Sequence, residues 1–423
     1  MPQPALPALL IARLTFFYGW VILACVCCAA FARQGPAVAT LSIFVEPMAS
    51  DFGWSRTALS GAVSLGGVMA AVASPLIGPM LDRRGARMML CAAVLVTGAC
   101  NMLLSLTQSL AAFYLFFCIA RMNFAGPFDI GIYGALNSWF VARRPLANSI
   151  VNLAHMAGLA AMPLIAQLAI AEHGWRAGWL AVGATVILVG FVPAWLLLLR
   201  RPEDVGLVPD GYAPVPAGGA GPAKAALAEP EFTRAQALRT PAFWLLSLYT
   251  VAIFPVQAGV SLHQAPHLIE RGLGHGTAAA VVSVFSLAAG FGGVCFGLAA
   301  RRLGVRASLA LAGALAAAGT LLMLAIAAPL HGFAAGACFG VGIGGVLTIL
   351  PLAWADYFGR KSFGAIRGTA LSVQVTAQAA GPLISGALRD ATGDYSASLA
   401  AFAALSVLAA ALGLLTRAPR PPA

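Results

Sequence analysis

The chain contains very little charge. Of its 423 residues only 9% are Asp, Glu, Lys or Arg, whereas 60% are hydrophobic. A soluble domain carries about 25% charged residues, so this composition excludes a soluble globular fold of this length. The sequence also lacks a Gly-Lys-Ser/Thr phosphate-binding loop, which argues against an ATP-driven pump with its own motor domain.

Residue patterns typical of enzymes are missing as well. No paired carboxylates, Ser/His/Asp order or metal-ligand spacing stands out among the six histidines and eight cysteines. All eight cysteines lie in apolar stretches and are interpreted as small buried hydrophobic residues. We therefore expect no enzymatic activity, no cofactor and no bound metal.

Long apolar stretches are what the sequence has in abundance. A membrane-spanning helix needs about 20 apolar residues, and twelve candidates follow one another at 17–46, 57–80, 87–107, 109–138, 146–170, 176–199, 241–268, 276–300, 307–328, 331–355, 365–388 and 396–416. The first has no small-residue cleavage pattern and is expected to be retained. The sequence predicts an all-α integral membrane protein with twelve transmembrane helices.

The net charge of +11 raises the question of nucleic-acid binding, which the distribution of the basic residues answers. With both termini on the cytoplasmic side, the inner side holds nineteen basic residues, namely Arg13, Arg83, Arg84, Arg87, Arg143, Arg144, Arg200, Arg201, Lys224, Arg234, Arg239, Arg301, Arg302, Arg306, Arg360, Lys361, Arg367, Arg417 and Arg420. The outer side holds four, namely Arg56, Arg176, Arg271 and Arg389. This asymmetry is the positive-inside pattern. It predicts a multi-pass protein of the cell inner (plasma) membrane, with the lipid bilayer and not nucleic acid as its partner.

The second part of the sequence repeats the first in one constant register. Glycines and prolines match in that register, as at Pro36/Pro255, Pro47/Pro266, Gly53/Gly272, Gly78/Gly297, Gly85/Gly304, Pro163/Pro382 and Gly174/Gly393. Between the two copies, residues 200–239 are rich in Pro, Gly, Ala and charge and are predicted to be a cytoplasmic linker. We expect six-helix halves at 1–199 and 240–423, related by an axis normal to the membrane.

The loop Gly78–Arg87 resembles the signature loop between the second and third helices of the major facilitator superfamily, with its glycine, aspartate, basic pair, second glycine and basic residue. Further segments, at Phe17–Val21, Asp51–Arg56, Gly174–Arg176 and Asp356–Lys361, resemble the bacterial branch of monocarboxylate transporters and oxalate/formate antiporters. The resemblance covers nearly the whole chain. It implies the twelve-helix major facilitator fold and transport of a small molecule.

One departure from that branch concerns the anion anchor. Members of the branch often carry an arginine in the eighth helix that holds the substrate carboxylate, but Thr277–Ala300 contains no charged residue and only Ser283 and Ser286 as polar candidates. The interior positive charge lies instead in the first half, at Arg33 and Arg121. A carboxylate would have to be held there, or the substrate is not a simple carboxylate.

Ionised residues at membrane depth are functional candidates because burying a charge in lipid is costly. Arg33 lies inside the first span, followed by Gln34 and a Gly35-Pro36 break that exposes backbone groups. Arg33 and Gln34 are predicted to bind substrate. The alternative is that Arg33 pairs with Asp129 in a structural network.

The fourth span contains Arg121, at a position where the superfamily has an arginine commonly linked to proton coupling, and Asp129 eight residues later. Burial raises the pKa of a carboxyl group and a nearby guanidinium lowers it. A carboxyl group balanced in this way can bind and release a transported proton. Arg121 is predicted to bind substrate and, with Asp129, to take part in proton coupling. A fixed Arg121–Asp129 ion pair is the alternative.

Polar residues in the fifth and eleventh spans complete the predicted site. Asn152 and His155 lie on one face of the fifth span, and His155 is expected to bind substrate and to contribute to proton coupling, unless it is only hydrogen-bonded. Its repeat-related position is Gln374, followed one turn later by Gln378. Both glutamines are predicted to bind substrate.

The signature loop is predicted to act in gating. Asp82 can accept hydrogen bonds from backbone N–H groups at the start of a neighbouring helix, and Arg83 or Arg87 can pair with acidic or carbonyl groups. Gly78 and Gly85 permit close helix approach and a tight turn. If the basic residues only set topology, Asp82 remains unexplained.

Together these features predict a secondary transporter that moves a small organic anion of the monocarboxylate type and that is expected to be a monomer. The anion would be moved with a proton or exchanged for a counter-anion, by rocking of the two halves. The alternatives are a proton-coupled exporter of hydrophobic or cationic compounds, which would use Asp129 to recognise charge, and a membrane sensor that binds a ligand without moving it.

Overall fold

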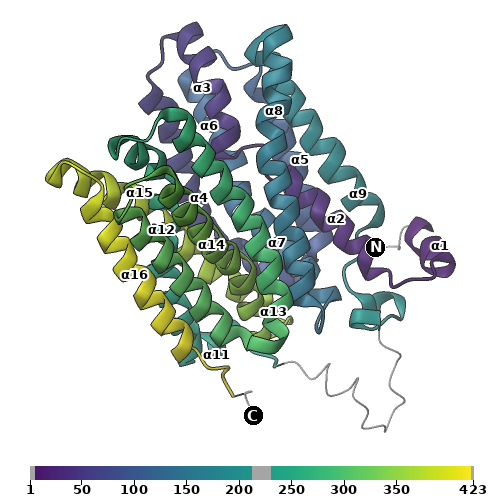
Figure 1. Cartoon of the computed structure of the whole chain (residues 1–423). Helices are drawn as coiled ribbons and strands as arrows, with labels where there is room; N and C mark the ends of the chain where they lie inside the picture. Colours follow the sequence, from purple (N-terminus) through teal and green to yellow (C-terminus); the bar gives the residue numbers. More distant parts are fainter. Residues whose placement is uncertain (1–4, 212–229, 421–423) are drawn as a thin grey trace. The chain divides into compact units, whose positions relative to one another are not determined.

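The computed structural model describes residues 5–211 and 230–420, which form helices and connecting turns and contain no strand. Figure 1 shows the helices as they follow the chain. In the first part of the chain they are α1 (Ala5–Arg13), α2 (Gly19–Ala32), α3 (Val38–Phe52), α4 (Arg56–Arg84), α5 (Ala86–Leu104), α6 (Leu110–Ala125), α7 (Pro127–Trp139), α8 (Arg144–Thr185), η1 (Val186–Phe191), α9 (Val192–Leu197), η2 (Pro202–Val205) and η3 (Pro209–Gly211). In the second part they are α11 (Arg234–Leu238), α12 (Pro241–Glu270), α13 (His275–Leu324), α14 (Pro329–Phe358), α15 (Phe363–Thr392) and α16 (Ser396–Leu415).

Eight helical segments of the described residues are long and apolar enough to cross a membrane. Two of them, Arg144–Leu197 with 54 residues and Gly276–Leu324 with 49 residues, are far too long for one crossing at about 1.5 Å per residue. Each changes direction at a glycine with non-helical backbone angles, Gly174 and Gly304, and covers two predicted spans. The first predicted span corresponds to α2 with α3 and the eleventh to α15, so each of the twelve predicted spans coincides with helix.

The internal repeat is visible in the backbone conformation. Six of the eight glycines with positive φ among the described residues form repeat-related pairs, at Gly53 and Gly272 (φ 68° and 85°), Gly85 and Gly304 (81° and 73°) and Gly174 and Gly393 (79° and 88°). Only glycine adopts these angles without a steric penalty. The same turns are therefore built by the same residue in both copies.

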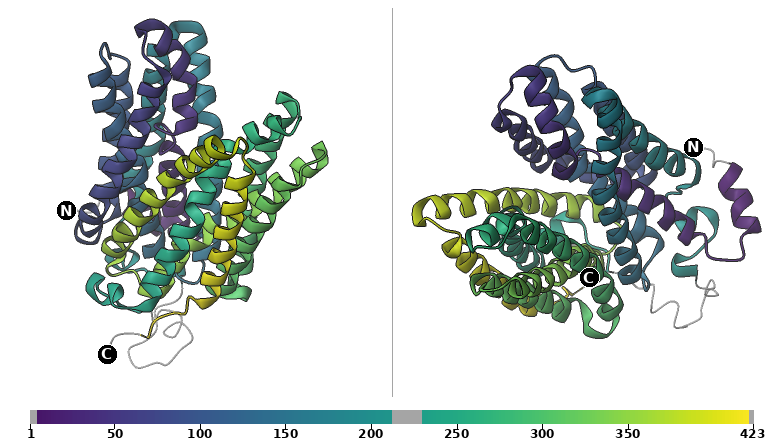
Figure 2. Two further views of the ribbon diagram at one scale, coloured as in Figure 1. Left: turned by 90° about the vertical axis from the view of Figure 1, so that its left-hand side faces the viewer. Right: turned by 45° about the horizontal axis from the view of Figure 1, so that its top comes forward.

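The chain forms two compact units. Unit 1 comprises residues 1–231 together with 359–372, and unit 2 comprises residues 232–358 and 373–423. In unit 1, α5 packs against α6 and α8, and in unit 2, α13 packs against α14 and α16. Figure 2 shows the helices of the chain from two further sides. The segment 359–372 includes the first turns of α15, so this one helix belongs to both units. The predicted linker 200–239 stays a prediction, and its residues 212–229 lie outside the described residues.

Two breaks in the helices of unit 1 position the polar residues. The first separates α2 from α3 at Pro36, which has no N–H to donate; the Gln34 carbonyl there accepts a hydrogen bond from Thr40 Oγ1 at 2.9 Å. The second separates α6 from α7 at Gly126, whose φ of −112° and ψ of −88° are not helical. Pro127 then starts α7, so Asp129 lies in the first turn of a new helix.

Candidate functional site

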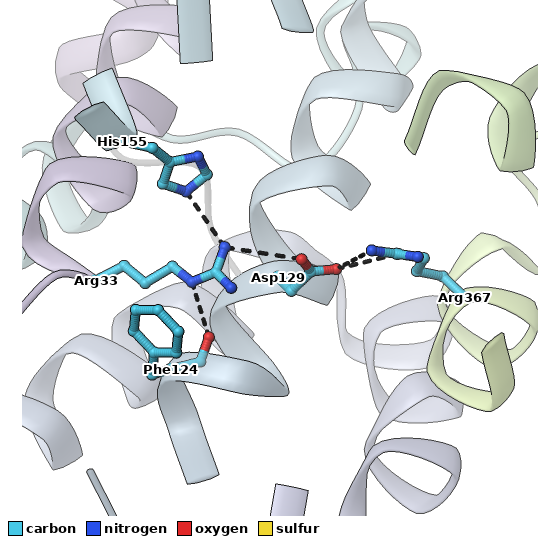
Figure 3. A network of polar contacts seen from close by, with 5 residues as sticks. All are labelled: Arg33, Phe124, Asp129, His155 and Arg367. Carbon is cyan, nitrogen blue, oxygen red and sulfur yellow. Dashed lines mark hydrogen bonds and ion pairs between the residues drawn. The ribbon is translucent and has the colours of Figure 1, made fainter. Parts of the chain in front are cut away.

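Asp129 lies between two arginines from different parts of the chain (Figure 3). Arg367, from the start of α15, donates through Nε (3.1 Å) and Nη2 (2.9 Å) to Asp129 Oδ1. Arg33, which follows α2, places Nη1 3.7 Å from Asp129 Oδ2. The side chains of Asp129 and Arg367 are only 6% and 2% exposed. The carboxylate is thus a buried bridge between two cations.

Arg33 is also tied to α6 and α8. Its Nε donates to the Phe124 carbonyl at 2.8 Å, and its Nη1 lies 3.3 Å from His155 Nε2. A guanidinium has no acceptor, so His155 must accept through an unprotonated Nε2. This contact therefore requires the neutral form of His155.

Arg121 lies close to the same group. The guanidinium carbons of Arg33 and Arg121 lie 4.5 Å and 4.2 Å from the centroid of the Phe124 ring, within the range of cation–π attraction. Their separation therefore cannot exceed the sum of these two distances. We call Arg33, Arg121, Phe124, Asp129, His155 and Arg367 the arginine cluster.

The arginine cluster has more positive than negative charge. Three guanidinium groups face one carboxylate, which leaves two positive charges in excess. Two donors are moreover buried without a hydrogen-bond partner among the described residues, Arg121 Nε and Arg367 Nη1. Buried donors without partners are rare because each costs free energy. A bound anion would compensate part of this charge and could accept a hydrogen bond from such a donor.

The local sequence explains where the carboxylate sits. Gly126 is the N-cap of α7 and Pro127 its first residue, so Asp129 occupies the third helical position. The free N–H groups of a first helical turn favour a negative charge there. Pro127 therefore begins a separate helix, α7, and does not merely bend one continuous helix.

The predicted topology counts Arg367 among the basic residues of the inner side, and in the structure this residue is 2% exposed and pairs with Asp129. One expectation needs correction. A fixed Arg121–Asp129 pair is one of the two alternatives for the fourth span, but the ion pairs of Asp129 in the described residues are with Arg33 and Arg367. The signal for Arg367 in the sequence is its position inside the predicted span 365–388.

The other predicted substrate residues are distributed over both units. Gln34 and Asn152 are 5% and 4% exposed in unit 1. In unit 2, Gln378 Nε2 donates to Gln257 Oε1 at 2.9 Å, and Gln374 Oε1 is buried without a hydrogen-bond partner in the described residues. Their roles in binding substrate stay predictions.

The signature loop contacts the start of α15. Asp82 accepts hydrogen bonds from the backbone N–H groups of Gly364 (2.8 Å) and Ala365 (2.9 Å). These N–H groups belong to the first turn of α15, where a carboxylate is favoured. This is the kind of contact expected of Asp82, whereas its role in gating stays a prediction.

Small residues bring α4 and the start of α15 together. A Cβ on Gly78 would lie 2.1 Å from the Gly364 carbonyl oxygen, and one on Gly368 would lie 2.4 Å from that of Ser74. One turn further, Ser372 Oγ donates to the Ala71 carbonyl. Gly364, Gly368 and Ser372 are spaced four residues apart, a pattern that permits close helix packing. This spacing could have been found in the sequence, but it was not among the predicted features.

The remaining residues of the loop act within unit 1. Arg87 Nη2 donates to the Trp195 carbonyl at 2.6 Å, at the end of α9. Gly85 has a φ of 81°, and a Cβ there would lie 2.8 Å from Arg200 Cγ. Arg83 is exposed at the end of α4. Their roles in gating stay predictions.

Comparisons with known proteins agree with this architecture. Human "Monocarboxylate transporter 11" is 28% identical over 414 residues, covering 94% of this chain and 81% of that protein. "Membrane sensor protein UhpC" of Salmonella typhimurium is 28% identical over 310 residues, covering 69% of this chain and 67% of that protein. The crystal structure of the human organic anion transporter MFSD10 (TETRAN) superimposes with a TM-score of 0.67 at 17% identity, over 97% of this chain and all of that chain, which shows the shared fold. The model of the Major Facilitator Superfamily matches residues 22–263, more than half of the chain, and the protein therefore belongs to this superfamily of membrane transporters.

Proposed function

We propose that this protein transports a small organic anion across the membrane by alternating access and exchanges it for another anion. The observation that carries the proposal is the excess of two positive charges in the arginine cluster, with buried donors on Arg121 and Arg367 that have no partner among the described residues. Arg33 and Arg121 would bind the anion, because Arg367 holds Asp129 more closely than Arg33 does, at 2.9 Å against 3.7 Å. The Nη1 of Arg367, which has no partner among the described residues, would be a further donor. The relatives named as monocarboxylate transporters support the same substrate class.

The charges also favour exchange over proton coupling. An empty cluster would carry uncompensated charge away from water during each conformational change, which is costly. A bound anion neutralises it, so the protein would cycle more readily when loaded in both directions. Protonating Asp129 would deprive two arginines of their counter-charge, and protonating His155 would remove the acceptor used by Arg33. The predicted proton coupling through Asp129, Arg121 and His155 is therefore less favoured.

A cation exporter is disfavoured for a related reason. The Asp129 carboxylate is only 6% exposed and engaged by two guanidinium groups, so it is poorly available to a cationic substrate. A sensor function is the second candidate, because one similar protein is named a membrane sensor. Sensor and transporter would share the anion site and differ in whether bound anion crosses the membrane.

The proposal includes the setting in which this occurs. We infer that the protein acts as a monomer in the inner (plasma) membrane with both termini in the cytoplasm, as the distribution of its basic residues predicts. Asp82 would then hold the start of α15 on the cytoplasmic side during part of the cycle.

Uptake into proteoliposomes tests the proposal. Small labelled mono- and dicarboxylates should enter vesicles preloaded with unlabelled anion, and a pH gradient should change the rate little. Arg33→Gln should weaken anion binding at least about tenfold, the equivalent of one charge-assisted contact. The exposed Arg302→Gln is the matched control and should leave binding unchanged.

Other outcomes would point elsewhere. Expulsion of a lipophilic cation without movement of carboxylates would contradict the anion proposal. Binding of an anion that depends on Arg33 but is followed by no flux would favour the sensor. Uptake that requires a pH gradient but no counter-anion would show proton coupling and contradict exchange.

A further inference from the structure

A polar cavity lies in unit 1, apart from the arginine cluster. Its empty space, including the open mouth, is about 360 Å³, and its polar lining comes from Asp82, Asn137, Ser138, Arg200, Arg201 and Arg360. No residue of the arginine cluster lines it. It lies at the C-terminal ends of α4 and α7 and beside the residues that follow α9.

Some of its charges are already engaged. Asp82 accepts the two N–H groups of α15, while Arg360 donates to the Ser138 carbonyl at 3.0 Å and pairs with Glu203 at 2.6 Å. Arg200 and Arg201 have no side-chain hydrogen bond or ion pair within the described residues. Arg201 interacts electrostatically with Asp82, but neither guanidinium is held by a hydrogen bond, so both can donate to a ligand.

Asn137 gives a second, independent indication of a ligand. It lines the cavity and is 1% exposed, yet neither its Oδ1 nor its Nδ2 has a hydrogen-bond partner in the described residues. A buried amide without partners is destabilising, and an apolar side chain would fit α7 better unless something binds there. Asn137 is thus a lining residue whose amide donor and acceptor are both without partners in the described part of the chain.

Gly85 helps to keep the cavity in this form. The stem of Arg200 lies over Gly85, where a Cβ would come within 2.8 Å of Arg200 Cγ. Gly85 also lines the cavity. The glycine of the signature loop therefore lets Arg200 lie close to α4 at the cavity wall.

We propose that this cavity binds a ligand that has a phosphate group and a hydroxyl group, either on the phosphate itself or beside it. The tetrahedral oxygens of a phosphate can accept from Arg200, Arg201 and Asn137 Nδ2, which come from two separate elements, whereas a planar carboxylate offers oxygens in one plane only. The hydroxyl would donate to Asn137 Oδ1. Basic cavities at this end of membrane helices suit lipid headgroups, and a free phosphate has the same chemistry.

Binding to the purified full-length chain tests this site. Dioleoylphosphatidylglycerol in mixed micelles and inorganic phosphate are titrated separately, and bound lipid is followed by native mass spectrometry and the rise in apparent unfolding temperature. The double variant Arg200→Gln/Arg201→Gln should raise the half-saturating concentration about tenfold or more. Asn137→Asp, which adds a negative charge to the cavity, should do the same. Arg302→Gln, in the second copy of the loop, should behave like the wild type within about twofold.

The two probes distinguish the sources of the phosphate. Stabilisation by phosphatidylglycerol alone identifies a lipid headgroup, and stabilisation by both probes shows that the phosphate group suffices. If neither probe binds, or if the double variant and Asn137→Asp bind both as the wild type does, the proposal is wrong. Because no lining residue belongs to the arginine cluster, anion uptake through that cluster can fail or succeed independently of this result.

Discussion

The two copies of the glycine and arginine loop, Gly78–Arg87 and Gly297–Arg306, are alike in their backbone and different in their charge. Gly85 and Gly304 share nearly the same angles, with φ of 81° and 73° and ψ of 163° and 167°. Arg87 donates to the Trp195 carbonyl, and its repeat-related residue Arg306 donates to the Leu414 carbonyl, at the position that corresponds to Trp195. The shared residues build the same turn and attach it to the last helix of each copy.

The difference lies at Asp82, whose position in the second copy is occupied by Arg301. Asp82 accepts two N–H groups from the start of α15, and a guanidinium has no acceptor with which to do so.

The interior shows a similar asymmetry. Arg33, Arg121 and Asp129 correspond to Ala252, Gly340 and Thr348, which are uncharged. Arg367 is the exception, since it comes from the second copy and still pairs with Asp129. Duplication thus preserved the residues that shape the fold, while most of the interior charge is concentrated in the first copy.

The largest effect is expected from making the first copy as neutral as the second. Asp129→Asn would leave Arg367, which is 2% exposed, without its counter-charge and should destabilise unit 1 by about 3–5 kcal/mol. Thermal unfolding in detergent measures the change. Asp129→Asn/Arg367→Gln should recover much of the loss, because the buried charge is then gone as well.

The equivalent position in the second copy provides the control. Thr348 is 1% exposed, and its hydroxyl has no hydrogen-bond partner in the described residues. Thr348→Val should therefore be neutral or slightly stabilising. Equal stability of Asp129→Asn and Thr348→Val would contradict the assigned asymmetry.

Removing the charge of Asp82 should have the next largest effect. Asp82→Asn keeps the shape but turns two charge-assisted hydrogen bonds into neutral ones, a loss of about 1–2 kcal/mol in total. The turnover rate in proteoliposomes should fall while the affinity for the anion stays the same. Glu172→Gln, at a side chain that is 78% exposed, is the control. A changed affinity with an unchanged rate would show that Asp82 serves binding and not gating.

A smaller effect is expected for the difference in stability between the variants Gly85→Ala and Gly304→Ala. Alanine at either Gly85 or Gly304 forces a conformation nearly restricted to glycine, at about 1–3 kcal/mol each. At Gly85 the new methyl group must also displace Arg200, whereas at Gly304 it meets nothing within 4 Å. Gly85→Ala should therefore lower the unfolding temperature more than Gly304→Ala. The reverse order would mean that Arg200 moves aside at no cost.

The smallest effect tests what the two copies share. Arg87→Gln removes one hydrogen bond to the Trp195 carbonyl, and Arg306→Gln removes the two that Nε and Nη2 donate to the single Leu414 carbonyl oxygen. Because each variant frees one carbonyl, each should cost about 0.5–1.5 kcal/mol. Equal shifts in unfolding temperature are expected. Unequal shifts would show that the loops are equivalent in geometry but not in energy.

Much of the architecture could be predicted because it depends on local properties of the chain. The twelve spans follow from apolar length, and the turns at Gly85, Gly174 and Gly304 follow from a residue that tolerates positive φ. Arg33, Asp129 and His155 stand out in the sequence because charged and polar side chains are rare at membrane depth. The pairing of Arg33 with Asp129 is one of the alternatives that the sequence offers, and the structure shows it. The contacts of Asp129 with Arg367 and of Arg33 with His155 were harder to predict, since a sequence does not show which helix faces which.

The sequence by itself determined a twelve-helix membrane protein with an internal repeat and most of its interior charge in the first copy, because hydropathy, glycine and charge act over one helix or one turn. Only the tertiary structure decided that Asp129 pairs with Arg367, 238 residues away, and that Gly364, Gly368 and Ser372 bring α15 against α4. Such contacts depend on how helices pack, and packing is decided by the fit of many side chains from distant parts of the chain.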